Sequence, residues 1–511
     1  MTFQRLARLQ TSLMSPPRFA GGAFFLALSL FGLAGCWMIL ACVGHLAVAG
    51  FLLVTFLVLI MARWQHGIYA LLAYLPVAGI VTLSLSPWQG WPLLHPVLYK
   101  DWLFVVPAYL GFLASLVFRR ESLPRLPASL TFSMLALCLL VFAQALNPGV
   151  PNLLTALIGI KVWLFYLPLC VLTCSLVTSR RHLWRVFRLL VVLAIPPCMV
   201  GIAEYALAQS LGYAYTMQAI YGAAASAATQ KYTYFQIGEG ILPRIPSTFT
   251  FVSQYFGFTL AMLVPAYVIW RSDPSLRWRG FARWTLIVVT VASFLSGARA
   301  AFVFVPLLLA FMYGLDRGYK GASGALLYIG AALLGMLTVA RMTAAGMFSH
   351  VSELFSNYAV DTAYGGLLQA ITASPLGTGT GTNTGPARYA FTRPEFYSAI
   401  ENYYAKAVFE LGILGLILLC ILLAILIREG FRARHCLRGS PLRVSACAIL
   451  AFILTMALNS FKGWLLDLDP INVYFWVFTG LLFRLPSLAA EERAHLNRQS
   501  ALEAAPCESS T

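Results

Sequence analysis

Five arginines occupy positions that suggest chemistry. They lie in segments that a charge-based topology assigns to the outer side of a membrane, and they are Arg244, Arg299, Arg341, Arg388 and Arg393. Lys and Arg resist translocation and collect in inner loops, so outer cations need another reason. Guanidinium groups at a water-limited boundary bind phosphate and stabilise the charge that develops on a leaving diphosphate. An anionic ligand is one explanation, and contact with lipid headgroups or with solvent is the other.

Carboxylates and imidazoles near the same side are the candidate proton acceptors. Glu401 stands directly before Asn402 at the start of a long apolar segment. It is either a carboxylate stabilised by the helix dipole or a general base that takes a proton from a hydroxyl. Glu410 lies deeper in that segment, where an ionisable side chain serves either function or a helix contact. His350 and His95 are further candidate bases, although a solvated loop or an interfacial belt also explains them.

Two outer segments, about 207–248 and about 342–402, are long enough to form a site. The second contains a glycine-rich run from Ser374 to Gly385. Glycines let the backbone approach a ligand closely, and successive amides can surround phosphate oxygens. Gly377 and Gly379 are therefore candidate substrate-binding residues, and a flexible hairpin is the alternative.

The elements that must position these residues are membrane spans. The chain is 60% hydrophobic and only 10% charged over 511 residues, which predicts an all-α, polytopic transmembrane bundle. Windows of about 20 apolar residues predict about 12–14 spans. They lie near 21–41, 44–62, 67–86, 102–118, 127–145, 159–177, 186–206, 249–270, 281–296, 300–315, 323–341, 403–427, 443–461 and 470–484.

Loop charge supports this topology, with both termini in the cytoplasm. Basic residues recur in alternate loops: Arg63, Arg119, Arg120, Arg125, Arg180, Arg181, Arg185, Arg188, Arg271, Arg277, Arg279, Arg283, Arg317, Lys320, Arg428, Arg432, Arg434, Arg438 and Arg443. Acidic residues fall on the other side: Asp101, Glu239, Glu353, Asp361, Glu395, Glu401, Asp467 and Asp469. The net charge of +17 therefore reflects topology, and no nucleic-acid partner is expected. The 10 cysteines show neither a disulfide framework nor zinc spacing, so we expect no metal or other cofactor.

Four stretches together resemble the O-antigen polymerase and O-antigen ligase superfamily of bacterial inner-membrane glycosyltransferases. They are Gln144–Pro148 running on to Gly159–Tyr166; Arg244–Phe249; Leu295–Ala301; and Pro375–Gly379 leading to Glu401–Tyr404 and Glu410–Gly415. Their order and spacing cover roughly residues 140–416. The resemblance implies a multi-span transferase whose long outer loop closes over an undecaprenyl-diphosphate-linked glycan.

The chain departs from the family pattern at two positions. Lys161 stands where many relatives have Arg, and it keeps the charge but lacks the planar fork that grips phosphate bidentately. Glu401 stands where many relatives have His immediately before the Asn that is Asn402 here. The resemblance thus implies substrate binding by Lys161 and Asn402, with Glu401 as the base. A missing His weighs against a ligase.

The resulting hypothesis is an inverting, metal-independent polymerase of polysaccharide repeat units at the outer face of the inner membrane. Its domains would be N-terminal spans at 1–140, a catalytic membrane domain at 141–427 with outer loops 207–248 and 342–402, C-terminal spans at 428–484, and a cytoplasmic tail at 485–511. Expected partners are the lipid-linked oligosaccharide, membrane lipids, and assembly proteins such as a flippase or a chain-length regulator. An O-antigen ligase acting on lipid A core, or a lipid-linked glycan transporter, is the alternative; the nearly charge-free midplane weighs against a transporter.

Overall fold

The computed structural model describes residues 45–85, 95–118, 123–124, 126–212, 214–216, 218–220, 222, 234–237, 240–318, 330, 364–385 and 400–504. Eight of its helices are long and apolar enough to cross a membrane. This confirms the expectation of a multi-pass helical protein. The predicted spans near 21–41 and 323–341 lie outside the described residues, so the total of about 12–14 spans stays a prediction.

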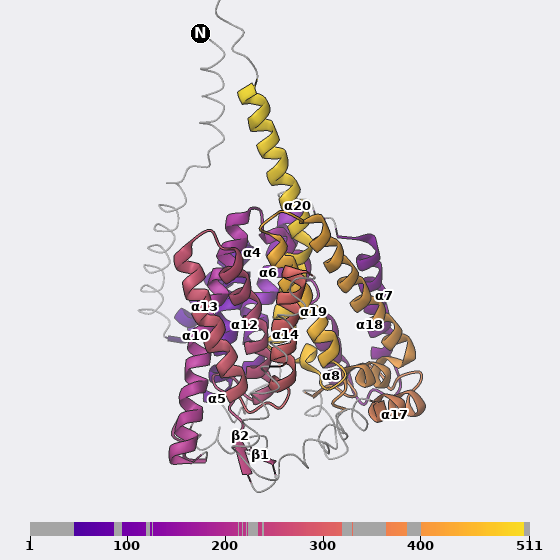
Figure 1. The fold of residues 1–511 in the computed structure, drawn as a ribbon. Coiled ribbons are helices and arrows are strands. Elements are labelled where there is room, and N and C mark those ends of the chain that lie inside the picture. The colour runs from indigo at the N-terminus through magenta and orange to yellow at the C-terminus, as the bar shows by residue number, and fades with distance from the viewer. Residues whose placement is uncertain are drawn as a thin grey trace, which may run out of the picture. The chain divides into compact units, whose positions relative to one another are not determined.

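Helices make up most of the described chain (Figure 1). They are α3 (His45–Ala62), α4 (Trp64–Tyr74), α5 (Ala78–Ser84), α6 (Val106–Phe118), α7 (Ala128–Ala145), α8 (Leu153–Leu164), α9 (Leu169–Leu176), α10 (Arg180–Leu211), α12 (Val252–Ser272), α13 (Leu276–Leu295), α14 (Ala301–Arg317), α17 (Gly366–Ala373), α18 (Tyr403–Cys436), α19 (Arg443–Asn459) and α20 (Ile471–Ala504). Two strands, β1 (Tyr234–Ile237) and β2 (Gly240–Pro243), form an antiparallel hairpin. The hairpin is a small departure from the all-α expectation, and it lies in the predicted outer loop 207–248.

The chain divides into two compact units. The first comprises residues 1–68 and 101–120, and in it α3 packs against α6. Trp64 contacts Phe112 edge to face, with ring centroids 5.0 Å apart. The second unit comprises residues 69–100 and 121–511 and contains every described candidate residue.

Helix α12 forms the centre of the second unit. It is apolar on all sides, and 89% of its spanning window is buried, as expected for a helix surrounded by other helices. Helices α10, α13, α19 and α20 pack around it, and α18 packs on α7, α19 and α20. This packing fixes the ends of the helices, and hence the loops that join them.

Two of the interrupted spans carry candidate residues. Turns at residues 165–168, which include Pro168, separate α8 from α9, because proline cannot donate a helical hydrogen bond. In α18, Gly412 has a φ of 77° and breaks the helical backbone. Glycine tolerates this conformation, which most other residues avoid. The break lets the amide of Ile413 donate to the carbonyl of Pro375 at 2.9 Å.

The second unit has a loop end, which we define by the segments 146–152, 244–251, 296–300, 374–385, 400–402 and 460–470. The helices run antiparallel, so these connections gather at one end of the unit, on the side where Figure 1 shows α17 and the β1–β2 hairpin. The opposite end carries the last turns of α12 and α14 and the exit of α20. Arg244, Arg299, Gly377, Gly379, Glu401 and Asn402 lie in these loop-end segments, whereas Lys161, Glu410 and His95 lie elsewhere.

Candidate functional site

Arg244 and Arg299 are brought together by a direct link between their loops. The amide of Ile245 donates to the carbonyl of Ser296 at 3.0 Å. Arg244 precedes Ile245, and Arg299 follows Ser296 in the tight turn between α13 and α14. Both arginines are half-buried. Two of the five arginines that the sequence singled out therefore lie in loops that contact each other.

The segment after Arg244 is fixed inside the protein. Ser247 donates from its amide to Oε2 of Glu204 at 3.0 Å and from Oγ to the carbonyl of Pro197 at 2.6 Å. Thr248 Oγ1 donates to the carbonyl of Pro76 at 2.5 Å. Ser247 has a φ of 53°, which is uncommon for a residue with a side chain and is held only where the surroundings over-determine it. Buried hydrogen bonds of this kind hold the neighbouring arginine in a defined place.

Glu204 is a functional-site neighbour that the sequence-based interpretation did not include. Its side chain is 1% exposed within α10, and it positions the Arg244 segment through Ser247. A lone carboxylate inside an apolar span is costly and therefore informative. That signal was present in the sequence.

Lys462 interacts electrostatically with the two arginines and with Glu401. It lies in the loop between α19 and α20 and is partly buried. Burial lowers its pKa to about 8; Glu401 acts in the opposite direction, and Arg299 and Arg244 lower the pKa further. Lys462 therefore lies within electrostatic reach of all three. We call Arg244, Arg299, Glu401 and Lys462 the charged cluster.

Glu401 reaches this cluster because the start of α18 is tied to the α19–α20 loop. The amide of Tyr403 donates to the carbonyl of Ser460 at 2.9 Å. Asn402 caps the helix: its Oδ1 accepts from the amides at 404 and 405, at 2.9 and 3.2 Å. Asn402 is fully buried, whereas Glu401 is exposed. The oxygen of Asn402 thus has a structural role, and its predicted contact with substrate stays a prediction.

The glycine-rich loop packs into the protein. The amide of Gly377 donates to Ser374 at 3.0 Å, and that of Gly379 donates to the carbonyl of Glu410 at 3.1 Å. The side chains of Gln144 and Asn147 donate back to the carbonyls of Leu376 and Gly377 at 2.7 and 3.2 Å. The backbone amides of Gly377 and Gly379 therefore already have hydrogen-bond acceptors within the protein. The prediction that Gly377 and Gly379 offer amides to phosphate gives way to a structural role for the loop.

Glu410 anchors this loop from inside α18. Its fully buried carboxylate accepts from Nε1 of Trp163 at 2.6 Å, from the amide of Asn383 at 2.8 Å and from Oγ1 of Thr384 at 2.9 Å. Asn383 Oδ1 in turn accepts from the amide of Ile400 at 3.1 Å. Of the two roles left open by the sequence, the structure supports a structural contact. This contact also places the residue before Glu401.

Lys161 occupies a different place. Its Nζ lies 5.9 Å from the ring centroid of Tyr166, and Nζ of Lys100 lies 5.8 Å from the same ring. Both are cation–π distances.

A buried ion pair supports the α19–α20 loop. Lys406 pairs with Asp467, and both side chains are almost fully buried. The Lys406 ammonium lies 5.0 Å from the ring centroid of Trp163. Burial raises the pKa of Asp467 to about 6, although Lys406 acts to lower it. The pair links the α19–α20 loop to α18, and removing either partner would leave an uncompensated buried charge.

Three predicted substrate-binding residues, Arg341, Arg388 and Arg393, lie outside the described residues, as does His350. Of the predicted catalytic residues, the structure brings together Arg244, Arg299 and Glu401. It adds Lys462, which satisfies the argument applied to the arginines: it is a cation in a predicted outer loop. Within the described part of the chain, no group of three or more His, Cys, Asp and Glu side chains is arranged to hold a metal ion.

The charged cluster combines three basic side chains with one carboxylate, so its formal charge is positive when all four are ionised. Such a site attracts an anion, and arginine forks suit a phosphate or diphosphate. An exposed carboxylate beside it can accept a proton from a second, neutral reactant. No protein-family model matches the chain, and no curated protein matches it.

Proposed function

We propose that this chain is a membrane glycosyltransferase that polymerises lipid-diphosphate-linked oligosaccharide repeat units into a surface or exopolysaccharide. One observation supports it above the others. Arg244, Arg299 and Lys462 come from three separate loops, and the charges of both arginines and of Glu401 act on Lys462. A phosphate-binding group of cations beside a proton acceptor, at the ends of membrane helices, suits a substrate with a lipid tail and a diphosphate.

The reaction needs two kinds of help that the charged cluster offers. An acceptor hydroxyl oxygen attacks the anomeric carbon, and the bond from that carbon to the diphosphate oxygen breaks. The leaving diphosphate takes the electron pair, and Arg244, Arg299 and Lys462 stabilise its growing charge. Glu401 takes the hydroxyl proton. Attack opposite to the leaving group inverts the anomeric carbon.

The proposal also specifies the membrane that contains the protein and the side of it that the loop end faces. We propose that the loop end faces outward from the bacterial inner membrane, with both termini in the cytoplasm, because the strongly basic loops alternate along the chain. Reporters fused near positions 220 and 370 should then be extracytoplasmic, and reporters near 275 and 435 cytoplasmic. A cytoplasmic reporter at 370 would remove the charged cluster from the side on which lipid-linked glycans are polymerised.

Analysis of lipid-linked intermediates tests the function itself. In a strain from which the gene is deleted, single lipid-linked repeat units should accumulate and long polymer should disappear. Re-expression of the wild-type chain should reverse both. Accumulation of full-length lipid-linked chains would point to a ligase instead. Retention of substrate on the inner leaflet, detected by its protection from added glycosidases, would point to a transporter.

A further inference from the structure

The glycine-rich loop, residues 374–385, returns between three membrane-spanning helices at a depth inside their ends. Oγ1 of Thr380 donates at 2.8 Å to the carbonyl of Val141, a full turn before the last residue of α7. Gly159 lies more than one turn inside α8, and a Cβ added to it would come within 2.4 Å of the amide nitrogen of Gly381. Only glycine permits so close an approach, so the loop fits against α8 at this residue.

The third helix, α18, opens to receive the loop. In a regular helix the amide of Ile413 would donate to the carbonyl of Phe409, four residues earlier. Because the backbone breaks at Gly412, that amide donates to Pro375 at 2.9 Å, and the Phe409 carbonyl accepts from the amide of Thr378 at 2.7 Å. Gly412 lies more than two turns inside α18. All three helices belong to segments long and apolar enough to cross a membrane, so the loop lies within the layer that they span.

Backbone at this depth must have its polar groups paired inside the protein, because hydrocarbon offers no partner. The loop meets this requirement. The amides of residues 377–380 donate to Ser374, Phe409, Glu410 and Gln144, and the carbonyls of residues 374–377 accept from Gly377, Ile413, Gln144 and Asn147. Residues 379–381 and 383–384 are buried. A loop in water has no such requirement, because water pairs the groups that the protein leaves open.

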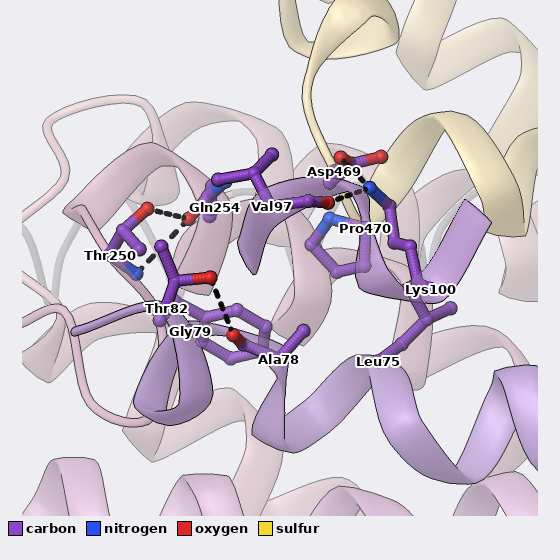
Figure 2. A pocket seen from close by; sticks show the side chains of 11 residues that line it. Leu75, Ala78, Gly79, Thr82, Val97, Lys100, Thr250, Gln254, Asp469 and Pro470 are labelled. Carbon is purple, nitrogen blue, oxygen red and sulfur yellow. Dashed lines mark hydrogen bonds and ion pairs between the residues drawn. The ribbon is translucent and has the colours of Figure 1, made fainter. Parts of the chain in front are cut away.

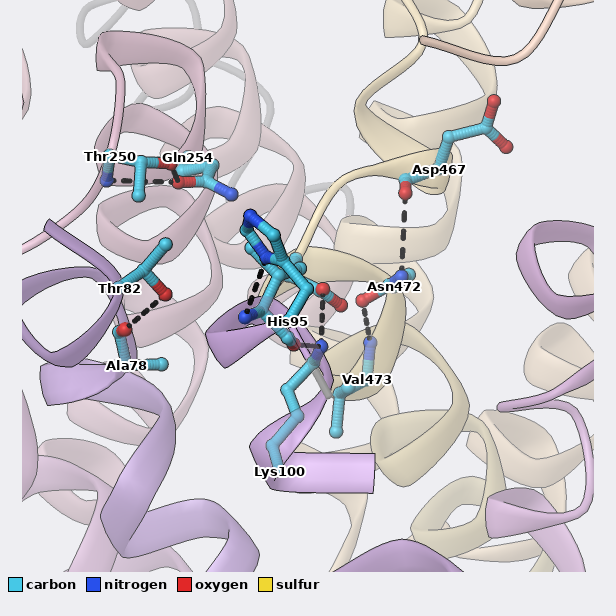
Figure 3. A network of polar contacts seen from close by, with 11 residues as sticks. Ala78, Thr82, His95, Lys100, Thr250, Gln254, Asp467, Asn472 and Val473 are labelled. Atoms are coloured by element: carbon cyan, nitrogen blue, oxygen red, sulfur yellow. Dashed lines mark hydrogen bonds and ion pairs between the residues drawn. The ribbon is translucent and has the colours of Figure 1, made fainter. Parts of the chain in front are cut away.

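Another irregular region, where the turn before Lys100 meets the start of α20, uses charged groups instead. Nζ of Lys100 lies 2.7 Å from Oδ2 of Asp469 and donates to the carbonyl of Val97 at 2.9 Å (Figure 2). Nδ2 of Asn472 donates to the carbonyl of Asp467 at 3.4 Å (Figure 3). Charged side chains are costly in hydrocarbon and need a partner inside the protein. The glycine-rich loop, by contrast, contains no charged residue.

The tip of the loop is apolar and exposed. Leu376 is 84% exposed. Pro375 beside it is also exposed, and it has no N–H group to leave unpaired. The carbonyls of both residues have partners within the protein. In water this leucine would leave a large apolar area exposed, and contact with hydrocarbon removes that cost.

The tip adjoins the exposed apolar faces of two spans. On α7 a single row recurs every three or four residues and continues just past the helix: Phe132, Leu135, Leu139, Phe142 and Leu146. Leu414, Ile417 and Ile421 form a second row on α18. Residues at this spacing share one face of a helix, and such a face on a membrane span contacts lipid. The hydrogen bonds from Gln144 and Ile413 join the tip to both helices, next to these rows.

We propose that residues 374–385 form a re-entrant loop within the membrane and that Pro375 and Leu376 contact the hydrocarbon of the surrounding lipids. The partner of this surface is the acyl layer, and neither glycan nor diphosphate binds there. The amide of Ile400 donates to Oδ1 of Asn383 at 3.1 Å. The lipid-facing loop is thereby joined to the residue before Glu401.

The depth of a nitroxide label tests this placement. The full-length protein in phosphatidylcholine nanodiscs, with its 10 native cysteines replaced by alanine, would be labelled at Leu376→Cys, Leu139→Cys or Arg438→Cys. Oxygen concentrates in hydrocarbon and a nickel chelate in water, so the ratio of their collision rates reports depth. Position 376 should match position 139, in the exposed row of α7, and differ several-fold from position 438, which is exposed between α18 and α19. A ratio at 376 equal to that at 438 would overturn the re-entrant loop.

A charge substitution in the protein with its native cysteines provides a second measurement. Leu376→Asp should lower the melting temperature in nanodiscs by several degrees or prevent insertion, because a carboxylate in hydrocarbon is costly. Leu376→Met remains apolar and should melt as the wild type does. For a leucine exposed to water, aspartate would have little effect, as at most surface positions. A Leu376→Asp protein that melts at the wild-type temperature would therefore place Leu376 in water. Neither measurement requires polymerisation, so the proposed function is tested separately.

Discussion

The charged cluster and the glycine-rich loop lie at the same end of the second unit, yet they use polar groups in opposite ways. In the loop, the amides of Gly377 and Gly379 and the carboxylate of Glu410 all have partners within the protein. In the cluster, Arg244, Arg299 and Lys462 are held near one another although like charges repel, and burial and the two arginines lower the pKa of Lys462 to about 8.

The difference teaches how to separate structure from function among the polar residues of a membrane protein. Hydrogen bonds that pair buried polar groups stabilise the fold and leave no free donor or acceptor there for a ligand. Like charges gathered by rigid backbone links are unfavourable for the fold alone and become favourable when an anion binds. Substitutions in the two regions should therefore have different consequences, as the following predictions specify.

The largest effect is expected from the arginines of the charged cluster. Arg299→Ala and Arg244→Ala should each abolish polymer while the protein remains inserted, because the leaving diphosphate loses a guanidinium; removing one such group costs about 10²–10³ in rate. Lys at either position should restore little, since the bidentate fork is lost. Polymer on gels and protein level by immunoblot provide the measurement. Arg277→Ala, at an exposed position of α13, is the control. Near-normal polymer from both Ala variants would show that neither arginine is needed to bind the diphosphate.

Glu401→Gln should come next, with turnover reduced by roughly two to four orders of magnitude if Glu401 is the base. Glutamine keeps the size and the hydrogen bonding but cannot take the proton. Single-turnover transfer with purified lipid-linked substrate would measure the rate, and a pull-down of that substrate would show retained binding. A variant that polymerises at the normal rate would leave Glu401 as a carboxylate at the helix terminus.

In the glycine-rich loop, substitution should affect folding rather than chemistry. Glu410→Gln places an amide donor against either Trp163 or the Asn383 and Thr384 pair, so a buried donor loses its acceptor at a cost of about 1–3 kcal/mol. The melting temperature in detergent should fall. Glu491→Gln, at an exposed surface pair with Arg484, should change it little. A stable Glu410→Gln protein that has lost turnover would show that Glu410 takes part in the chemistry. The glycine-rich loop and the charged cluster would then no longer differ in role.

The smallest effect concerns pH. Lys462, whose pKa is about 8, is mostly charged at pH 7 and mostly neutral at pH 9, so affinity for the anionic substrate should fall several-fold as pH rises through 8. Stability should move the other way. Because folding lowers this pKa from about 10.4, the unfolded chain binds more protons between about pH 8 and 10, and stability rises there.

Lys462→Arg sharpens this test, because arginine stays charged throughout the range. KM for the lipid-linked substrate, measured from pH 6.5 to 9.5, should rise above pH 8 in the wild type and stay flat in Lys462→Arg. Thermal melts over the same range separate binding from unfolding. An alkaline limb of equal size in both proteins would assign the titration to another group.

Local patterns in the sequence predicted much of the architecture correctly. Apolar windows predicted the positions of α7, α12 and α19 and the start of α18 to within a few residues, because the hydrocarbon layer requires long apolar helices whatever their neighbours are; α18 continues nine residues beyond its predicted end. The placement of Arg244 and Arg299 in connections between spans followed from the same windows. The glycine-rich run was harder to interpret, because a sequence shows that amides exist but does not show which acceptors they meet.

The sequence alone thus determined a multi-pass helical protein with cations placed in alternate loops, since hydropathy and charge act on each segment separately. Only the tertiary structure decided which polar residues share a site. It joined the Arg244 loop to the Arg299 turn through Ile245 and Ser296, added Lys462 from a distant loop, and used Glu410 to hold the loop at 374–385. These contacts link residues tens to hundreds of positions apart. Helix packing creates them, and no local pattern records which helix ends will meet.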